Sequence, residues 1–380
     1  MPVYKTKGKK DGLQKYNVRI NFTTKNGEAK QMTRTAYGLE AAKDLERKLI
    51  DEIKETDYNP SKKITVQQLF DKYITVKKDE VKESTLDKAI RDYGYYIKAT
   101  FADTRIDRLT IEKLQDWKIE MNKKGLAYRT KKSAFGTFRV MLNWAIKMEY
   151  LKSNPLVKVG NFKNPTGKKT EMSIYTAEDF KKYITTVREQ AEKQQAEKQE
   201  LSGFDFLAFF AIAFYCGLRK GEIHALRFSD LKSGYLTVSR SINQRLKGGD
   251  RETPPKTKSS VRTLQMPLPL IKIINEHKAR QKQTFENFTD DYRICGGTTP
   301  IRDATILARN RKYAKLAELK TIRIHDFRHS HVSLLANEGI NIQEIARRLG
   351  HARVEETWNT YSHLYPREEE KAVDILNRIA

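Results

Sequence analysis

The sequence contains few of the residues that stabilise secreted or membrane-bound proteins. Its 380 residues include only two cysteines, Cys216 and Cys295, and no Cys-x-x-Cys pair. Such sparse cysteine is typical of a reducing intracellular compartment and excludes a disulfide framework. The longest apolar stretch, residues 204–218, is too short to span a bilayer and predicts a buried helix instead. The first residues, MPVYKTKGKK, lack the apolar segment of a secretory signal, so we expect no membrane partner.

Acidic residues are also in short supply. There are 48 Asp and Glu against 73 Lys and Arg, which gives a formal net charge of +25. A positive field of this size attracts polyanions, and nucleic acid is the usual partner. The net charge is +6 over residues 1–63, +9 over 64–165 and +10 over 166–380, so the excess is spread along the chain. We therefore expect every domain to contact the same polyanion.

The N-terminal residues predict a small β unit. The pattern indicates a strand over 15–22, a turn at Asn26-Gly27, a return strand over 28–35 and a helix over 39–55. Alternation in the first strand leaves Lys15 and Arg19 on its outward face. Because a β-ribbon can enter a major groove, we interpret residues 1–58 as a DNA-binding domain. A purely stabilising subdomain is the alternative.

Residues 64–155 predict a domain built only of helices. Apolar spacing indicates helices over 65–73, 84–99, 110–124 and 127–148, with Thr65, Ser84 and Thr110 as N-caps. Lys131 and Lys132 lie early in the last helix, where side chains and helix-end N–H groups can meet phosphate. Four aromatic residues are interpreted as core rather than base-stacking groups: Tyr93, Tyr95, Tyr96 and Trp144.

The second half predicts a mixed domain that is mainly helical. Residues 156–172 are interpreted as a linker, and residues 173–380 as the catalytic domain. The expected elements are helices over 176–200 and 204–218, a strand pair over 235–242 and 261–266, and mostly helix from Leu268 onward. The fold class expected for the whole chain is therefore multi-domain and mainly α, with a small β-sheet-plus-helix domain first and an α+β domain last.

Five motifs in the second half carry residues suited to phosphodiester chemistry. They are Arg219 in GLRKGE, Lys258 in KTKSSVR, His325 and Arg328 in HDFRH, His351 in LGH, and Tyr361 in NTYSH. Arg219 starts a predicted helix over 219–231, and Glu222, one turn later, is placed to orient it. The alternative for Arg219 and Glu222 is a purely structural ion pair. Lys256 is an alternative to Lys258 as the catalytic lysine.

Together these residues predict a metal-independent attack on phosphorus. The arginines would stabilise the charge of the transition state, and Tyr361 would be the nucleophile. A phenol has an ordinary pKa near 10, so it needs a base or a cationic setting, which His325 or Lys258 could supply. Lys258 is our first choice as general acid for the leaving 5′-oxygen. A metal site at His325, His329 and His331 is the rival interpretation, but HEXXH and further ligands at the right spacing are absent.

The motif set resembles the tyrosine recombinases, and most closely the three-domain integrases of phages and integrative conjugative elements. The family pattern of Arg, Lys, His-x-x-Arg, His or Trp, and Tyr is matched by the residues named above. The resemblance implies an arm-binding domain over 1–58, a helical, SAM-like core-binding domain over 64–155 and a catalytic domain over 173–380. It also implies a 3′-phosphotyrosine intermediate and no cofactor.

The same resemblance implies the partners and the setting. Double-stranded DNA would be bound at core and arm attachment sites by a homotetramer, together with an excisionase or a host DNA-bending protein. The amphipathic tail Pro366–Ala380 would dock on a neighbouring subunit, or else on its own domain. The expected location is the bacterial cytoplasm, on the nucleoid. The alternatives are a type IB topoisomerase, which needs no paired sites, and a non-catalytic DNA-binding regulator, which needs no nucleophile.

Overall fold

The computed structural model divides the chain into two compact units, residues 1–168 and 169–380. It describes residues 3–23, 29–56, 64–164, 172–198, 202–244, 251–253 and 260–364, together with residues 373, 376 and 377. The described chain is mainly helical and carries small antiparallel sheets, so the predicted fold class is confirmed. No helix in this described part combines the length and the hydropathy needed to cross a bilayer.

The N-terminal residues form a three-stranded antiparallel sheet with one helix. The elements are β1 (Val3–Lys10), β2 (Leu13–Thr23), β3 (Ala29–Tyr37) and α1 (Leu39–Thr56), with the sheet in the order β1-β2-β3. The predicted hairpin and helix are confirmed. The sequence pattern missed β1, because this strand lies at the sheet edge and buries too few side chains to alternate clearly. Asn26-Gly27 lies outside the described residues.

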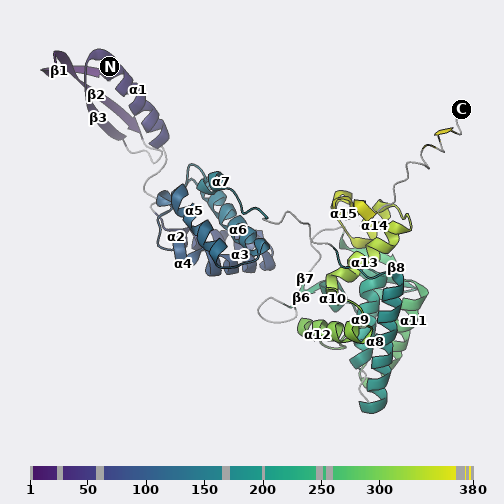
Figure 1. The fold of residues 1–380 in the computed structure, drawn as a ribbon. Helices are drawn as coiled ribbons and strands as arrows, with labels where there is room; N and C mark the ends of the chain where they lie inside the picture. Colours follow the sequence, from purple (N-terminus) through teal and green to yellow (C-terminus); the bar gives the residue numbers. More distant parts are fainter. Residues whose placement is uncertain are drawn as a thin grey trace. The chain divides into compact units, whose positions relative to one another are not determined.

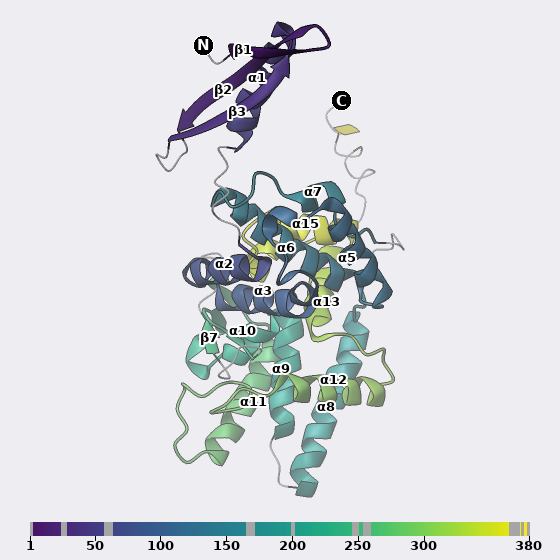
Figure 2. The same ribbon diagram turned by 90° about the vertical axis from the view of Figure 1, so that its left-hand side faces the viewer.

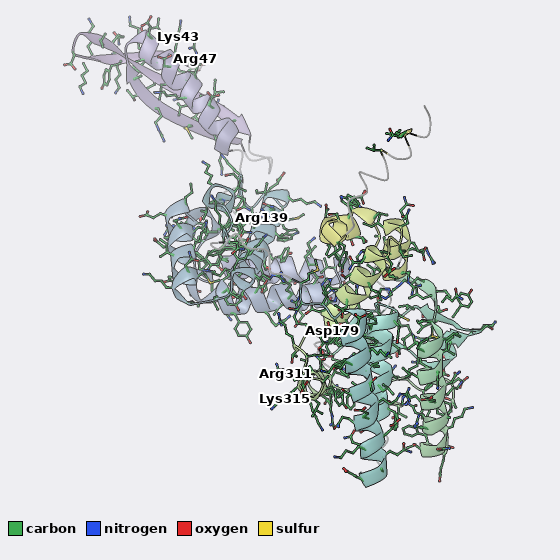
Figure 3. All side chains as sticks on the ribbon, turned by 45° about the vertical axis from the view of Figure 1, so that its right-hand side comes forward. Lys43, Arg47, Arg139, Asp179, Arg311 and Lys315 are labelled. Carbon is green, nitrogen blue, oxygen red and sulfur yellow. The ribbon has the colours of Figure 1, made fainter. Side chains whose placement is uncertain are left out.

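The predicted inward face of β2 packs against α1. Val18 is completely buried with Ala42 and Leu49, because alternate residues of a strand point to the same side of the sheet. Arg19 is exposed on the opposite face and Lys15 is half-buried. Lys43 and Arg47, labelled in Figure 3, are exposed one turn apart on α1 (Figure 1), so this unit carries cations on its helix as well as on its sheet.

Residues 64–164 form a helical bundle. The helices are α2 (Val66–Glu80), α3 (Glu83–Tyr96), α4 (Lys98–Phe101), α5 (Ile111–Lys123), α6 (Tyr128–Lys147) and α7 (Pro155–Val159), with a 3₁₀ turn at Ile106–Arg108. The N-caps Thr65 and Thr110 are confirmed, since each hydroxyl accepts a backbone N–H. The predicted cap at Ser84 is wrong: α3 starts one residue earlier, after Lys82, without a side-chain cap.

The core of this bundle is aromatic. Trp117 lies at its centre and donates from Nε1 to the carbonyl of Tyr96 at 2.7 Å. Tyr93 and Trp144 are buried as predicted, but Tyr95 is 74% exposed, because it lies on the solvent side of α3. Leu156 and Phe162 are buried in the same core, so the chain leaves the bundle later than the predicted linker start at residue 156.

The second unit surrounds the buried helix predicted at 204–218. This helix is α9 (Ser202–Tyr215), and it contacts α8 (Ala177–Lys198), α10 (Lys220–Ala225), α11 (Leu268–Thr284) and α13 (Ile324–Asn337) (Figure 1, Figure 2). Its side chains are apolar on every face, so it needs neighbours all round. The helix α12 (Asp303–Leu316) packs on α8, and α14 (Ile342–Leu349) and α15 (Val354–Tyr361) pack on α13.

Two small sheets lie among the described residues of this unit. One has the order β4-β5-β8, from β4 (Leu231–Lys232), β5 (Tyr235–Val238) and β8 (Arg262–Gln265). The other pairs β6 (Ser241–Asn243) with β7 (Arg251–Thr253). The predicted pairing of 235–242 with 261–266 is confirmed for β5 and β8, but the first strand breaks in two after Val238. Most of the tail from Pro366 lies outside the described residues.

Candidate active site

Arg219 lies at the N-cap of α10, as the sequence predicted. Its backbone N–H donates to Glu222 Oε2 at 2.9 Å and its Nη1 donates to Oε1 at 3.0 Å. The helix ends at Ala225, six residues earlier than predicted, and a separate 3₁₀ turn follows at Phe228–Asp230. Glu222 therefore holds Arg219 by both backbone and side chain, while the Arg219 side chain stays 40% exposed and open to an anion.

Glu222 is shared with a second guanidinium that the sequence analysis did not single out. Arg262, at the start of β8, donates from Nη2 to Glu222 Oε2 at 2.9 Å, and both side chains are buried. Burial alone would raise the pKa of Glu222, but Arg262 and then Arg219 outweigh it and hold that pKa below its usual range. Glu222 is therefore a buried carboxylate whose charge is balanced by two arginines.

Arg262 also ties together backbone segments that lead to other motifs. Its Nε donates to the carbonyl of Arg348 at 2.6 Å and its Nη1 to that of Ser260 at 3.1 Å. Gly350 follows with φ of 65°, and a Cβ there would lie 2.9 Å from Arg262 Nη1, so this turn requires glycine. Arg262 ends the motif KTKSSVR, but nothing local in the sequence shows that it faces Glu222.

Arg328 is almost completely buried on α13. Nη1 donates to the carbonyl of Gly217 and Nη2 to that of Leu349, each at 2.9 Å. Burial, and then Arg219, lower the pKa of Arg328 to about 9, which leaves it charged at neutral pH. The guanidinium thus joins the turn before Arg219 to the turn before His351.

His351 contacts Arg328 directly. Its Nε2 lies 2.9 Å from Arg328 Nη2, and its Nδ1 lies 2.8 Å from Thr357 Oγ1. A guanidinium can only donate, so Nε2 accepts and Nδ1 carries the hydrogen that is donated to Thr357. Burial, followed by Arg328 and Arg219, lowers the pKa of His351 to about 4. At neutral pH His351 is therefore neutral, with one tautomer fixed.

Tyr361 ends α15 and is 2% exposed. Burial raises its pKa to about 12, although Arg328 and Arg219 act in the opposite direction. Its hydroxyl lies 2.6 Å from His329 Nδ1, a contact that the sequence analysis missed. His329 stands next to Arg328 in HDFRH, but nothing local in the sequence shows which residue of a later helix it faces.

His325 and Arg328 both lie on α13, but in different environments. The His325 side chain is exposed near the start of the helix, and its ring lies 4.8 Å from the ring of His329. The surrounding protein, then His329 and Arg328, lower the pKa of His325 to about 4. His331 is buried against Gly217, away from both. The described residues contain no group of three His, Cys, Asp or Glu arranged to hold a metal ion.

The remaining candidates lie elsewhere. Lys256 and Lys258 lie outside the described residues, in the segment between β7 and Ser260. On α6, Lys131 donates to Asn122 Oδ1 at 2.8 Å, whereas Lys132 is exposed beside the ring of Tyr128. The structure thus brings together Arg219, Glu222, Arg328, His351 and Tyr361 and adds Arg262 and His329.

Known proteins are similar to this chain in sequence and in fold. The ICEBs1 integrase of Bacillus subtilis is 27% identical over 374 residues, which is 97% of both chains. A XerC-like tyrosine recombinase of Caldanaerobacter subterraneus is 26% identical over 78% of both chains. The Tn1549 transposon integrase, solved with a circular intermediate DNA, aligns with a TM-score of 0.64 at 22% identity, over 83% of this chain and all of that one.

Family profiles cover most of the chain. The profile of the phage integrase SAM-like domain matches residues 47–164. That of the phage integrase family matches residues 173–368, which is more than half of the sequence and includes all the catalytic motifs. The chain therefore belongs to the phage integrase family of tyrosine recombinases, the enzymes that cleave and rejoin DNA strands.

Proposed function

We propose that this recombinase integrates and excises a mobile DNA element through a 3′-phosphotyrosine formed on Tyr361. The observation that carries the proposal is the convergence of charge on this tyrosine. Arg328 and Arg219 both lie close enough to lower the pKa of its buried hydroxyl. Two cations beside one phenol suit a pentacoordinate phosphorus, whose negative charge develops on non-bridging oxygens.

Each residue then has a distinct task. Arg219, held by Glu222 and partly exposed, and Arg328, held by two carbonyls, bind the non-bridging oxygens. His351 is neutral and donates to Thr357, so it orients Arg328 rather than adding charge. Lys258, as in the sequence analysis, protonates the leaving 5′-oxygen, and His325 faces the side open to substrate.

We propose the domain roles and the partners by analogy with the family. Residues 1–58 bind arm-type DNA through Lys15 and Arg19, residues 64–155 bind the core site with Lys131 and Lys132, and residues 173–380 cleave it. The lambda integrase, 16% identical and with a TM-score of 0.53 over 93% of this chain and 96% of that one, was solved as a tetramer on a Holliday junction. We propose the same homotetramer here, acting on the nucleoid of a bacterial cytoplasm, with an excisionase or a DNA-bending protein as partner.

A covalent adduct tests the function. Duplexes from the DNA that flanks the gene are nicked near the crossover point, so that the cleaved strand cannot be rejoined. The enzyme should then accumulate as a protein–DNA adduct on a denaturing gel. Tyr361→Phe should form none while binding the same DNA, because the ring that packs is retained and the attacking oxygen is lost. An adduct formed by this variant would place the nucleophile elsewhere.

A sulfur-substituted substrate tests the proton donor. In a 5′-bridging phosphorothioate, sulfur replaces the leaving 5′-oxygen and departs without protonation. This substrate should therefore restore cleavage by Lys258→Ala. Lys256→Ala is the matched control and should slow the oxygen substrate only weakly. Rescue of Lys256→Ala alone would reverse the assignment.

Cleavage should also persist in EDTA. Loss of cleavage on chelation, with recovery on added zinc, would return the histidines to a metal-binding role.

A further inference from the structure

His329 makes the closest contact to the proposed nucleophile. Its Nδ1 lies 2.6 Å from Tyr361 Oη, and the two rings are tilted by 54° with centroids 5.5 Å apart. Among the described residues, the Tyr361 hydroxyl makes this one hydrogen bond. His329 is half-buried, and Tyr361 is buried, so little water competes for this contact.

The hydrogen of this bond lies on the tyrosine in one of the two neutral tautomers of His329. Burial raises the pKa of Tyr361 to about 12 and lowers the pKa of His329 from its ordinary value, so both groups are neutral at pH 7. A neutral phenol and a neutral imidazole share one hydrogen between Oη and Nδ1 when Oη donates and Nε2 carries the ring hydrogen. In that tautomer, the lone pair of Nδ1 points at the proton that must leave when Oη attacks.

We propose that His329 is the general base that takes the phenolic proton of Tyr361 during strand cleavage. The proposal rests on Tyr361 being the nucleophile. As the Oη–P bond forms, the proton moves from Oη to Nδ1, and the P–O5′ bond breaks with protonation of the 5′-oxygen by the separate general acid. In rejoining, the 5′-hydroxyl attacks and gives its proton back to the deprotonated general acid, and the His329 imidazolium returns its proton to Oη as the Oη–P bond breaks, so no outside reactant is needed.

The other histidines near the site are arranged for different roles. The Nε2 of His351 is occupied by Arg328 Nη2, and its Nδ1 by Thr357. His325, which the sequence analysis considered as base, has its side chain exposed near the start of α13 and contacts the ring of His329. His325 is therefore open to solvent, whereas His329 contacts the phenol.

The charges around His329 support a base that is unprotonated at rest. Arg328 on the same helix and Arg323 at its N-cap lower the pKa of His329, and Asp326 raises it, while burial lowers it most. His329 also contacts Tyr361, which lies on α15, and His325, which lies on its own helix α13. Asp326 lies close enough to stabilise the charge of the imidazolium formed in cleavage. Because burial and the arginines oppose this effect, the imidazolium can still give the proton back.

Single-turnover adduct formation on the nicked duplex tests this role. His329→Asn keeps an oxygen that can accept from Tyr361 but cannot take up its proton, whereas His329→Ala loses both properties. For a general base, both variants should be slower than the wild type by at least about 100-fold. Added imidazole should restore part of the rate of His329→Ala, and the 5′-bridging phosphorothioate should not. The acid limb of the wild-type pH–rate profile should be absent from His329→Asn.

Two results would overturn the assignment. If His329→Asn cleaves at the wild-type rate with an unchanged acid limb, His329 only positions the hydroxyl. If the phosphorothioate restores His329→Ala and imidazole does not, the histidine acts on the leaving group. Failure of the proposed function has a different signature, because Tyr361→Phe would then still form the adduct. Equal DNA affinity and melting temperature among the variants control for misfolding.

Discussion

The helical bundle and the catalytic unit treat buried polar groups in opposite ways. Among the described residues of the first unit, Asn154 is the one buried polar side chain, and the bundle core around Trp117 is aromatic and aliphatic. The second unit buries Glu222, Arg262, Arg328 and several histidines. Burying a charge is costly unless it is paired, and each of these charged side chains has close partners.

The difference separates stability from chemistry. Hydrophobic burial is enough to stabilise a bundle whose described core is aromatic and aliphatic. The catalytic unit accepts the desolvation of its guanidiniums because fixed cations in a low-dielectric site stabilise a developing negative charge more strongly than mobile ones do. All seven histidines also fall in this second unit, between His224 and His363. The comparison therefore predicts that activity and pH sensitivity reside in one unit.

The largest effect is expected at Arg328. Arg328→Lys keeps the charge but cannot reach the carbonyls of Gly217 and Leu349 while also contacting His351. We expect adduct formation to slow by about 10²–10³-fold in single-turnover assays with saturating DNA. A lysine variant with nearly normal rates would show that charge alone suffices, and the comparison would lose its main support.

Trp117→Ala should reverse this pattern. Removing the central aromatic side chain of the bundle should destabilise it by about 3–5 kcal/mol. Urea unfolding of the intact chain, followed by tryptophan-independent probes such as far-UV circular dichroism, measures the loss. Adduct formation at saturating DNA and low temperature should change much less than in Arg328→Lys. Equal losses of stability in both variants would contradict the contrast between the units.

Acid should weaken the catalytic unit first. Burial lowers the pKa of His331 to about 3, so below its ordinary pKa of 6.5 the unfolded chain binds a proton that the folded unit does not. Stability is therefore full above pH 6.5 and falls as the pH decreases toward 3, by about 2 kcal/mol at pH 5 from this residue alone. Thermal unfolding at pH 7 and pH 5 measures the shift. His331→Gln should flatten it, and an unchanged slope would exclude His331 as its source.

The smallest effect is expected on the bundle surface. Lys132 is exposed, whereas Lys131 is already engaged with Asn122. Lys132→Ala should reduce the slope of log affinity against log salt by about 1, because one phosphate contact is lost. The same change at Lys98, exposed on α4, is a matched control. A larger effect at Lys98 would show that DNA binds to the side of the bundle that carries α4.

Local patterns predicted the elements well. The alternation of residues 15–22, the caps at Thr65 and Thr110 and the apolar helix at 204–218 each depend on neighbours within a few residues, and all are confirmed. Patterns failed where burial was incomplete. The edge strand β1 has no clear alternation, and Tyr95 is aromatic but lies on the outer side of its helix. Hydrophobicity alone does not say which side of an element is covered.

The sequence by itself determined the family, the order of the domains and the residue types of the site, because motif spacing and net charge are properties of the chain. Only the tertiary structure decided which side chains of the site contact one another. Arg262 reaches Glu222 from 40 residues away, and His329 faces Tyr361 from 32 residues away. Such contacts depend on how α13 and α15 dock and where β8 begins, and docking is set by the packing of many side chains that no single motif records.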